Sequence, residues 1–336
     1  MSNKLVVNGE PSFGRFSQPV GEINYLDYSY HSVMDKPLSN WRKRLKFNQF
    51  QFVGMMNPEL VCGVAIVDLK YVSNAFVYLY DFKRKKLTEC SFLSPLALGT
   101  SMPLTPDAGA ASYQKSGCQF AMIADVESGQ RQIAVQADQI KIQAILYPGR
   151  GYQPLRVCSR AGYNGWSYTQ KAAGMPVEGE IRLGDDVYRL SPDTAFGSSD
   201  WSAGYMRRET SWNWACLSGL TETGEKVGLN LAAGVNETGV TENGLWLNGR
   251  LIDLGLATFE FQRKDPMRTW RISTTDGNLD LIFEPEGVRK EKIDMWLVAS
   301  NFKQMFGRYS GEVKSGRKSY RLNGVPGFAE DHFARW

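Results

Sequence analysis

The sequence predicts an all-β protein built from antiparallel strands. Short segments of alternating apolar and polar residues recur along the chain, and turn residues separate them about every ten to twelve positions. Asn-Gly and Asp-Gly pairs, which favour the positive φ angles of tight hairpin turns, stand between several of these segments. The 33 glycines fit a chain with many turns and bends. Together these patterns are typical of an antiparallel sandwich or barrel.

The strands expected in the first half either alternate in polarity or are rich in β-branched and aromatic residues. These segments are residues 61–69, 74–82, 118–126, 131–138 and 140–147. The third and fourth flank a Glu-Ser-Gly turn signal, which predicts a hairpin. In the fifth, the isoleucines at 140 and 142 fall on the same face, as expected for a half-buried strand.

The second half carries clearer hairpin signals. Gly184-Asp185-Asp186, Asn248-Gly249 and Asp276-Gly277 each stand between two short alternating segments. Helical patterns are few, and residues 286–292 and 300–306 are the segments expected to hold a short helix.

Pro and Gly residues are dense in the middle of the chain, which predicts a boundary between two β units. We place the N-terminal unit at residues 1–158 and the C-terminal unit, with the main candidate pocket, at residues 159–336. The crossover also contains Trp166, Tyr168 and Lys171, and a plain linker rarely holds so many aromatic residues. We therefore expect these three side chains to enter the pocket of the second unit and bind a ligand.

The composition limits the classes of partner. Hydrophobic residues make up 43% of the chain and charged residues 22%, which is typical of a globular protein with a sizeable core. The formal net charge of +4 is too small to predict nucleic-acid binding without a focused basic patch. No apolar run approaches membrane-spanning length, and the first residues contain no apolar signal core. We expect a cytoplasmic protein without an integral membrane segment.

No metal or cofactor is predicted. The five cysteines form no CxxC pair, and the two histidines, His31 and His332, lack partners at metal-ligand spacing. No glycine-rich loop of the kind that binds a dinucleotide or a phosphate follows a predicted strand. Cys62, Cys118 and Cys216 lie in apolar or aromatic segments and are expected to be small core residues.

Residues 200–215, DWSAGYMRRETSWNWA, interleave charged side chains with indoles, which suits the wall of a ligand pocket. On a strand, Trp212 and Trp214 share one face and can stack on a planar or cationic ligand. A tryptophan-rich core is the alternative interpretation. The ligand-binding candidates in this segment are Trp201, Arg207, Arg208, Trp212 and Trp214, and the catalytic candidates are Asp200 and Glu209.

Residues 327–336, GFAEDHFARW, form a second segment in which acids, an imidazole and aromatic rings are mixed. On an extended backbone, Glu330 and His332 share one face and Asp331 lies on the other. A carboxylate beside an imidazole favours the protonated imidazole, so Glu330 and His332 are further catalytic candidates. The alternative is a salt-linked anchor that closes the fold.

The chain resembles the domain-of-unknown-function family 2804. The resemblance covers nearly the whole chain and is carried, in order, by NGW at 164–166, YTQK at 168–171, the segment 200–215, GLNLAAG at 228–234, TEN at 241–243, QMFGRYSG at 304–311 and GFAEDHFARW at 327–336. More distantly, the chain is similar to double-calycin proteins: carotenoid 1,2-hydratases, tocopherol-cyclase-like proteins and AttH-like proteins. That resemblance implies an all-β fold of two lipocalin-like (calycin) antiparallel barrels or curved sheets packed together, with few short helices. It also implies a hydrophobic, lipid or isoprenoid-like ligand, but it transfers no established reaction.

Three functions are compatible with these features. The leading hypothesis is an enzyme that binds a lipid or isoprenoid-like molecule and transfers a proton from a carboxylic acid, as a hydratase, cyclase or isomerase does. Lys171 or the arginines at 207 and 208 would hold an anionic head group. The alternatives are a non-catalytic lipid carrier and a carbohydrate-active protein with tryptophan platforms and paired carboxylates. Several ionisable groups facing one cavity would favour the enzyme, and an almost wholly apolar lining would favour the carrier.

Overall fold

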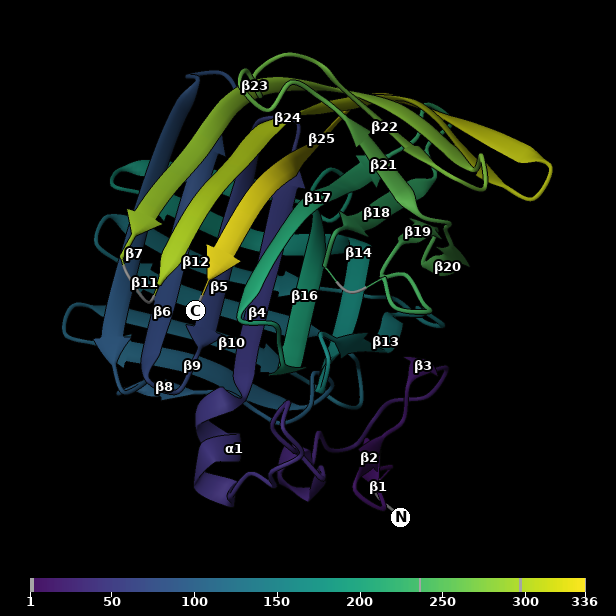
Figure 1. Ribbon diagram of the computed structural model, residues 1–336. Coiled ribbons are helices and arrows are strands. Elements are labelled where there is room, and N and C mark those ends of the chain that lie inside the picture. Colours follow the sequence, from purple (N-terminus) through teal and green to yellow (C-terminus); the bar gives the residue numbers. More distant parts are fainter. Residues whose placement is uncertain (1–2, 236, 296–297, 336) are drawn as a thin grey trace.

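The computed structural model describes residues 3–235, 237–295 and 298–335, and these residues form two strongly curled antiparallel sheets (Figure 1). The predicted all-β class is therefore confirmed. The larger sheet and the segment that precedes it contain β1 (Val6–Val7), β2 (Glu10–Pro11), β3 (Gly14–Arg15), the 3-10 helix η1 (Tyr25–Asp27), α1 (Asn40–Lys46), β4 (Asn48–Asn57), β5 (Leu60–Asp68), β6 (Val72–Asp81), β7 (Lys86–Pro95), β8 (Thr100–Ser101), β9 (Gly109–Lys115), β10 (Cys118–Ala124), β11 (Arg131–Ala137), β12 (Ile140–Leu146), β13 (Leu155–Ala161), β14 (Gly165–Leu183), β15 (Asp186–Leu190) and β16 (Phe196–Tyr205). The smaller sheet contains β17 (Glu209–Leu220), β18 (Lys226–Ala233), β19 (Gly244–Leu247), β20 (Arg250–Asp253), β21 (Ala257–Glu260), β22 (Trp270–Thr274), β23 (Leu279–Asp294), β24 (Ala299–Ser315) and β25 (Lys318–Arg335).

The predicted hairpins are present. The turns at 127–129, 184–186, 248–249 and 276–277 connect β10 to β11, β14 to β15, β19 to β20 and β22 to β23. In the third of these turns both residues have positive φ, +51° at Asn248 and +82° at Gly249, as the tight hairpin turn requires.

The two short helices expected at 286–292 and 300–306 are absent, and this prediction was wrong. Both segments are strands, because residues 286–292 belong to β23 and residues 300–306 to β24. The two strands pair with each other along most of their length, and β24 also pairs with β25. Hydrogen bonds to neighbouring strands thus override the modest helix propensity of a Glu- and Lys-rich segment. Within the described residues, no helix is long and apolar enough to cross a membrane.

The larger sheet has the strand order β7-β6-β5-β4-β16-β14-β12-β11-β10-β9-β8 and folds over on itself. The sheet bends at β14, where a bulge between Ala172 and Met175 contains Gly174 at a φ of +74°. β14 pairs with β13 before the bulge and with β12 and β15 after it, while its pairing with β16 continues across the bulge. The apolar core enclosed by this fold includes Cys62 and Cys118, as predicted.

The smaller sheet, with the order β20-β19-β18-β17-β25-β24-β23-β22-β21, forms a third layer. Figure 1 shows β17 and β23–β25 crossing in front of β4–β7, with β9–β12 behind. The sheets come close where Gly228 of β18 meets the bulge of β14, since a Cβ at that position would overlap the backbone of Ala173. A glycine in the GLNLAAG motif therefore allows the two sheets to approach each other.

The chain passes from the larger sheet to the smaller one between Tyr205, where β16 ends, and Glu209, where β17 begins. The boundary expected at residues 158–159 lies within β13, and the crossover that follows it belongs to the larger sheet. The division of the chain into two separate domains stays a prediction.

Candidate functional site

The candidate site lies in the layer between the two sheets, where β4–β6, β14 and β16 face β17, β24 and β25. Its apolar part is a set of rings from both sheets. Phe52 of β4 lies 5.4 Å from Trp214 and 5.7 Å from Phe328, measured between ring centroids. Tyr78 of β6 lies 5.1 Å from Phe306 in the same way. We call this region the inter-sheet layer.

The register of the smaller sheet places polar residues in rows on the face that meets the larger sheet. One row crosses β17, β25, β24 and β23, and its successive Cα partners are Trp214, Glu330, Gln304 and Arg289. In the neighbouring row His332 pairs with the residue at 212 and lies on the same face as Glu330. The predictions that the tryptophans at 212 and 214 share a face, and that Glu330 and His332 share a face, are therefore confirmed.

Glu330 is a buried carboxyl group held by two hydrogen bonds. Only 4% of the residue is exposed, the Gln304 amide Nε2 donates to Oε1 at 2.7 Å, and the Trp212 indole Nε1 donates to Oε2 at 3.3 Å. Burial raises the pKa of Glu330 to about 8, although these two hydrogen bonds and the charge of Arg289 oppose the shift. The carboxyl group is therefore mostly protonated at neutral pH, which is the state that a general acid needs.

Lys171, Asp200 and Glu242 form a buried ionic trio on the opposite side of the layer. Lys171 Nζ lies 2.5 Å from the nearer Asp200 oxygen and 3.4 Å from a Glu242 oxygen. Burial acts to lower the pKa of Lys171, but the two carboxylates outweigh it and the net pKa is raised. Burial, with the charge of Asp200 added, raises the pKa of Glu242. Glu242 therefore holds a proton more readily than an ordinary glutamate does.

Trp214 and Cys216 connect the trio to the buried acid. The Lys171 ammonium lies 5.8 Å from the centroid of the Trp214 ring, on whose strand Cys216 also lies. Burial raises the pKa of the Cys216 thiol to about 12, and Asp200, Lys171 and Glu330 all act on this thiol electrostatically. The ionisable groups of both sheets therefore surround one small region.

Arg289 and His332 flank the acid. The Arg289 guanidinium lies over Phe76 at 4.5 Å and pairs with Glu89 at 2.5 Å between Nε and Oε2. The His332 ring packs against Trp212, with 4.2 Å between centroids, and its Nε2 lies 3.1 Å from the Ser300 hydroxyl.

The expectation that Glu330 favours a protonated His332 is wrong. Burial, followed by the positive charge of Arg289, lowers the pKa of His332 to about 3. The carboxyl group of Glu330 also carries little charge at neutral pH, because its own pKa is raised. His332 is therefore a neutral imidazole in the folded protein.

Other sequence candidates lie elsewhere. Trp166, Tyr168 and Trp201 lie on the opposite face of β14 and β16 from Lys171, and the N-terminal segment covers them. Trp166, for example, makes an edge contact with Tyr28 at 6.2 Å. These rings are buried in a tryptophan- and tyrosine-rich core.

Arg207, Arg208 and Glu209 lie at the connection between β16 and β17, where Arg208 and Glu209 are exposed. The structure thus brings together Lys171, Asp200, Trp212, Trp214, Glu330 and His332. The role given to each candidate stays a prediction.

Sequence reasoning missed Glu242, Gln304, Arg289 and Tyr78. Glu242 follows β18 in a loop, so its meeting with Lys171 cannot be inferred from strand alternation. Gln304 did carry a signal, since an amide between two phenylalanines on one face of a strand is unusual in an apolar layer. Within the described residues, the Tyr78 hydroxyl and the Gln304 Oε1 atom are buried without a hydrogen-bond partner. Buried polar atoms without a partner are rare in folded proteins.

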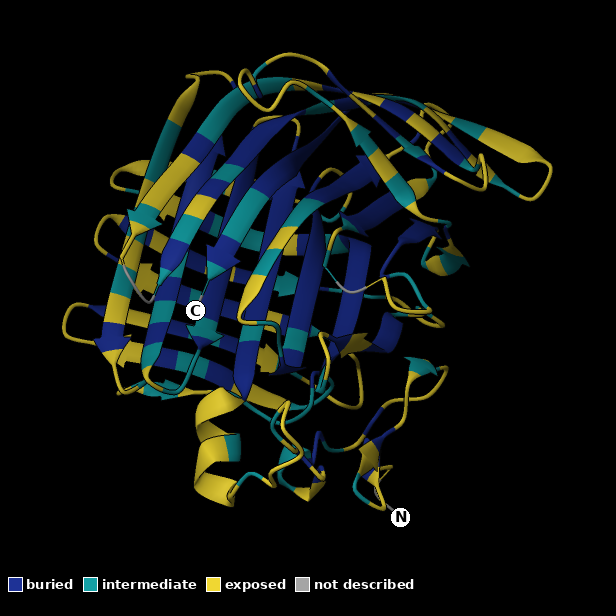
Figure 2. Cartoon of the chain, viewed as in Figure 1, coloured by how far each residue is buried: buried dark blue, intermediate teal, exposed yellow. Residues whose placement is uncertain are grey.

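The inter-sheet layer becomes more exposed toward one end. Along the side of β17 that faces the layer, Cys216 and Trp214 are buried, whereas Trp212 and Thr210 are half-buried. Figure 2 shows the same trend in the lower parts of β17 and β25. On the larger sheet, Phe52 is buried and Phe50, one row closer to this end, is half-buried. Access to the layer is therefore easiest where β4 and β17 begin.

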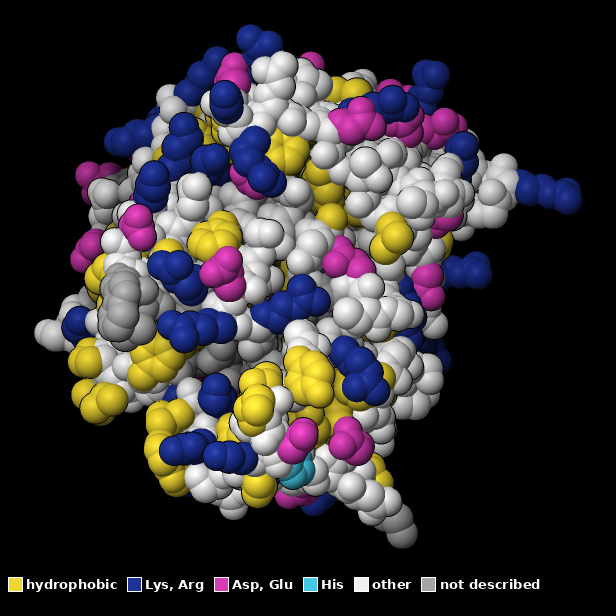
Figure 3. Space-filling model, in the orientation of Figure 1, with side chains coloured by type: hydrophobic (Ala, Val, Ile, Leu, Met, Phe, Trp, Pro, Cys, Tyr) yellow, Lys and Arg dark blue, Asp and Glu magenta, His cyan; other side chains and the backbone are white. Residues whose placement is uncertain are grey.

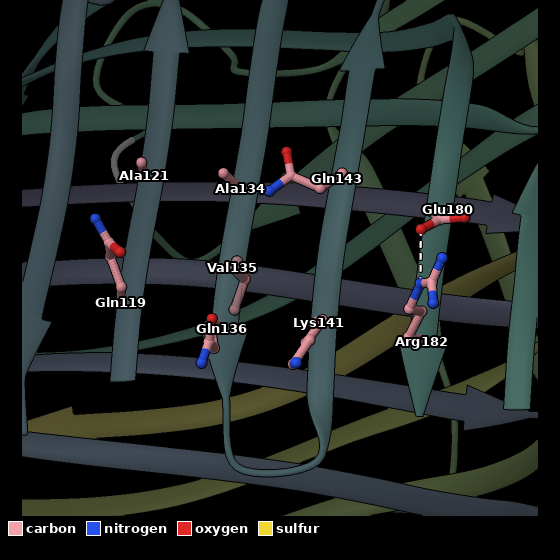
Figure 4. Close-up of a pocket in the computed structure, with 9 residues that line it drawn as sticks. All are labelled: Gln119, Ala121, Ala134, Val135, Gln136, Lys141, Gln143, Glu180 and Arg182. Atoms are coloured by element: carbon pink, nitrogen blue, oxygen red, sulfur yellow. Dashed lines mark hydrogen bonds and ion pairs between the residues drawn. The ribbon is translucent and has the colours of Figure 1, made fainter. Parts of the chain in front are cut away.

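A shallow depression on the outer face of the larger sheet is a weaker candidate (Figure 4). Its volume is about 240 Å³, and its polar lining includes Gln119, Gln136, Gln143 and Lys141. Its charged side chains are exposed, as in the Arg182–Glu180 pair, where each side chain is more than a third exposed. It contains none of the buried acids described above.

Glu330 is expected to make the stability of the protein depend on pH. Its pKa rises from the ordinary value of 4.5 to about 8 on folding, so the folded state holds a proton that the unfolded state releases between these values. The stability linked to this group is fully present below pH 4.5 and is lost as the pH rises through 8. From about pH 6 to about pH 9, we expect the free energy of unfolding of the wild type to fall by about 2–3 kcal/mol relative to Glu330→Gln. Urea denaturation of both proteins at several pH values measures this difference, and a constant difference would contradict the burial of an ionisable acid.

The fold is similar to those of several solved proteins. Kievitone hydratase from Nectria haematococca aligns with a TM-score of 0.51 and 12% identity over 84% of this chain and 88% of that chain. CghA aligns with a TM-score of 0.57 and 10% identity over 88% of this chain and 89% of that chain. An AttH-like protein from Nitrosomonas europaea aligns with a TM-score of 0.49 and 12% identity over 86% of this chain and 92% of that chain. At these identities the likeness concerns the fold.

The family is established by the sequence itself. No protein of the curated set matches the chain. Residues 10–336 match the model of a family described as "Domain of unknown function (DUF2804)", which agrees with the resemblance seen in the motifs. The chain therefore belongs to the DUF2804 family.

Proposed function

We propose that the protein is an enzyme that binds an apolar small molecule, of lipid or isoprenoid-like character, in the inter-sheet layer and transfers a proton to it from Glu330. The observation that carries the proposal is a buried carboxyl group whose pKa is about 8, held between an indole and an amide among aromatic rings. Burial of this kind is costly, and perturbed acids are concentrated at functional sites.

The geometry supports a reaction that passes through positive charge. The proton leaves the Glu330 carboxyl oxygen and forms a C–H bond on an electron-rich carbon, such as an alkene carbon, which leaves a cation on the adjacent carbon. The faces of Trp212 and Trp214, on the same side of the sheet as Glu330, would stabilise that charge. Water addition, ring closure or loss of another proton would then complete a hydration, a cyclisation or an isomerisation. That a hydratase shares this fold is consistent with such a reaction.

The number of ionisable groups supports an enzyme over a carrier. A carrier needs an apolar lining, whereas this layer contains Lys171, Asp200, Glu330 and Arg289, each of them at least nine-tenths buried. The paired carboxylates of a carbohydrate-active protein face an open cleft. Here the acids are enclosed between two packed sheets.

The test is native mass spectrometry of the purified protein, followed by denaturing extraction and identification of bound molecules. The extracted molecule is then incubated with the protein in D2O. An enzyme of this type incorporates deuterium at a carbon atom, because the proton of Glu330 exchanges with solvent. A carrier releases the molecule chemically unchanged and without deuterium, which would refute the proposal.

A further inference from the structure

The end of the molecule at which the inter-sheet layer is more exposed carries exposed apolar side chains from three separate segments. In α1, Trp41 is 60% exposed, and Leu45 lies one helical turn further on. The turn between β5 and β6 exposes Tyr71, and the segment from the end of β7 to β8 exposes Leu96, at 72%, and Leu98. Single exposed apolar residues are ordinary, but a contiguous group indicates an interaction surface.

The three segments are neighbours in space. The Leu96 backbone N–H donates to the Tyr71 carbonyl oxygen at 2.8 Å, which joins the second segment to the third. Lys70 Nζ lies 5.7 Å from the ring of Phe47, the residue directly after α1, which joins the first segment to the second. Figure 3 shows hydrophobic and basic side chains gathered over α1 and the adjacent end of β7. We call these residues of α1, 69–71 and 93–98 the apolar end surface.

The surface is basic as well as apolar. The sequence of α1, NWRKRLK, contains four basic residues and no acid. The Arg42 guanidinium lies 5.3 Å from the Trp41 ring centroid, and in the described part of the chain neither Arg42 nor Lys46 forms an ion pair. Two nearby charges are partly compensated, since Lys70 pairs with Asp68 at 2.6 Å and Arg208 precedes Glu209. The charge that remains unpaired is concentrated on α1.

The surface adjoins the more exposed end of the inter-sheet layer. β4 begins directly after α1, and Phe50 of β4 faces the inter-sheet layer. Leu93 of β7 shares that face, because the register links residues 50, 67, 74 and 93 across four strands. Arg208, which precedes β17, acts electrostatically on Tyr71. A molecule leaving an apolar phase in contact with this surface could therefore enter the layer without crossing water.

We propose that the apolar end surface docks the protein on an anionic lipid bilayer, from which the apolar ligand enters the inter-sheet layer. Indole and leucine side chains partition into the interfacial region of a bilayer, while arginine and lysine contact the lipid phosphates. A nucleic acid would leave the leucines without an apolar partner. This inference rests on the proposed function for the nature of the ligand, but docking itself is independent of the chemistry at Glu330.

The test is co-sedimentation of the full chain with vesicles of phosphatidylcholine alone and of phosphatidylcholine with one third phosphatidylglycerol. We expect the wild type to bind the anionic vesicles at least about 25-fold more tightly than the neutral ones. Arg42→Gln with Lys46→Gln should weaken this binding by about 25-fold, since each basic residue near an anionic surface contributes about fivefold. Trp41→Ser with Leu96→Ser should weaken binding to both kinds of vesicle. All four side chains are exposed, so these variants are expected to fold.

The matched control is Lys83→Gln with Lys85→Gln, which removes the same charge from the β6–β7 turn at the opposite end of the strands. It should bind anionic vesicles within about twofold of the wild type. Failure of the wild type to bind either kind of vesicle would overturn the inference and point to a protein partner. Equal losses of binding to anionic vesicles in the 42/46 variant and in the 83/85 control would also overturn it. Glu330→Gln should bind vesicles like the wild type, so a failure of docking and a failure of the proposed chemistry are distinguishable.

Discussion

Replacing Glu330 with Gln is expected to lower the rate of proton transfer to the ligand by about 10²–10⁴-fold without unfolding the protein. Gln has nearly the same shape and can still accept the hydrogen bond from the Trp212 indole, but it has no acidic proton. The measurement is the rate of deuterium incorporation into the extracted ligand in D2O, by wild type and variant, under single-turnover conditions.

The pH profile of the wild type provides an independent readout of the same group. Because the pKa of Glu330 is about 8, activity should be constant below that value and fall as the pH rises above it. Glu209→Gln is the matched control, since Glu209 was also a sequence candidate but is exposed. A large loss of rate in Glu209→Gln, or none in Glu330→Gln, would show that another group supplies the proton.

Replacing Lys171 with Met is expected to be strongly destabilising, by about 3–5 kcal/mol at neutral pH. The substitution keeps an unbranched apolar stem but leaves the carboxyl groups of Asp200 and Glu242 buried without their shared cation. The loss should be smaller at about pH 5, where the stranded acids take up protons more readily. Urea denaturation at the two pH values measures both effects.

Two further variants isolate the ionic trio. Adding Asp200→Asn and Glu242→Gln to Lys171→Met should restore most of the lost stability, because no buried charge then remains unpaired. Lys303→Met removes a half-buried lysine that lies 3.7 Å from Asp331, and it should cost no more than about 1 kcal/mol. A Lys171→Met loss as small as this control would contradict a buried, mutually dependent trio.

Strand alternation was readable from the sequence because it is a local property. A period of two places Trp212 with Trp214, and Glu330 with His332, wherever the strands lie in the fold. The hairpins were equally local, since the Asn248-Gly249 turn depends on two residues with positive φ. The prediction of a pocket wall in β17 and β25 rested on this local information.

Contacts between sheets were not readable in the same way. Asp200 and Trp201 are adjacent in β16 and point to opposite faces, so only one of them can line the inter-sheet layer. Which one does so depends on the N-terminal segment covering Trp201, and no pattern in β16 reveals that cover. Glu242 reaches Lys171 from a loop, across a long separation in sequence. The neutral state of His332 likewise depends on burial and on Arg289 from another strand.

The strand order of the smaller sheet has a consequence for how the protein folds. β17–β20 and β21–β25 are two meanders, each made of consecutive hairpin neighbours, and among the described residues only the pairing of β17 with β25 joins them. This seam links residues more than a hundred positions apart, so it carries the largest loop-closure cost in the sheet and should form late. The contact between the Trp212 indole and Glu330 crosses this seam. An intermediate with both meanders complete would therefore still have an ordinary, ionised glutamate, and uptake of a proton at neutral pH would mark the moment at which the seam closes.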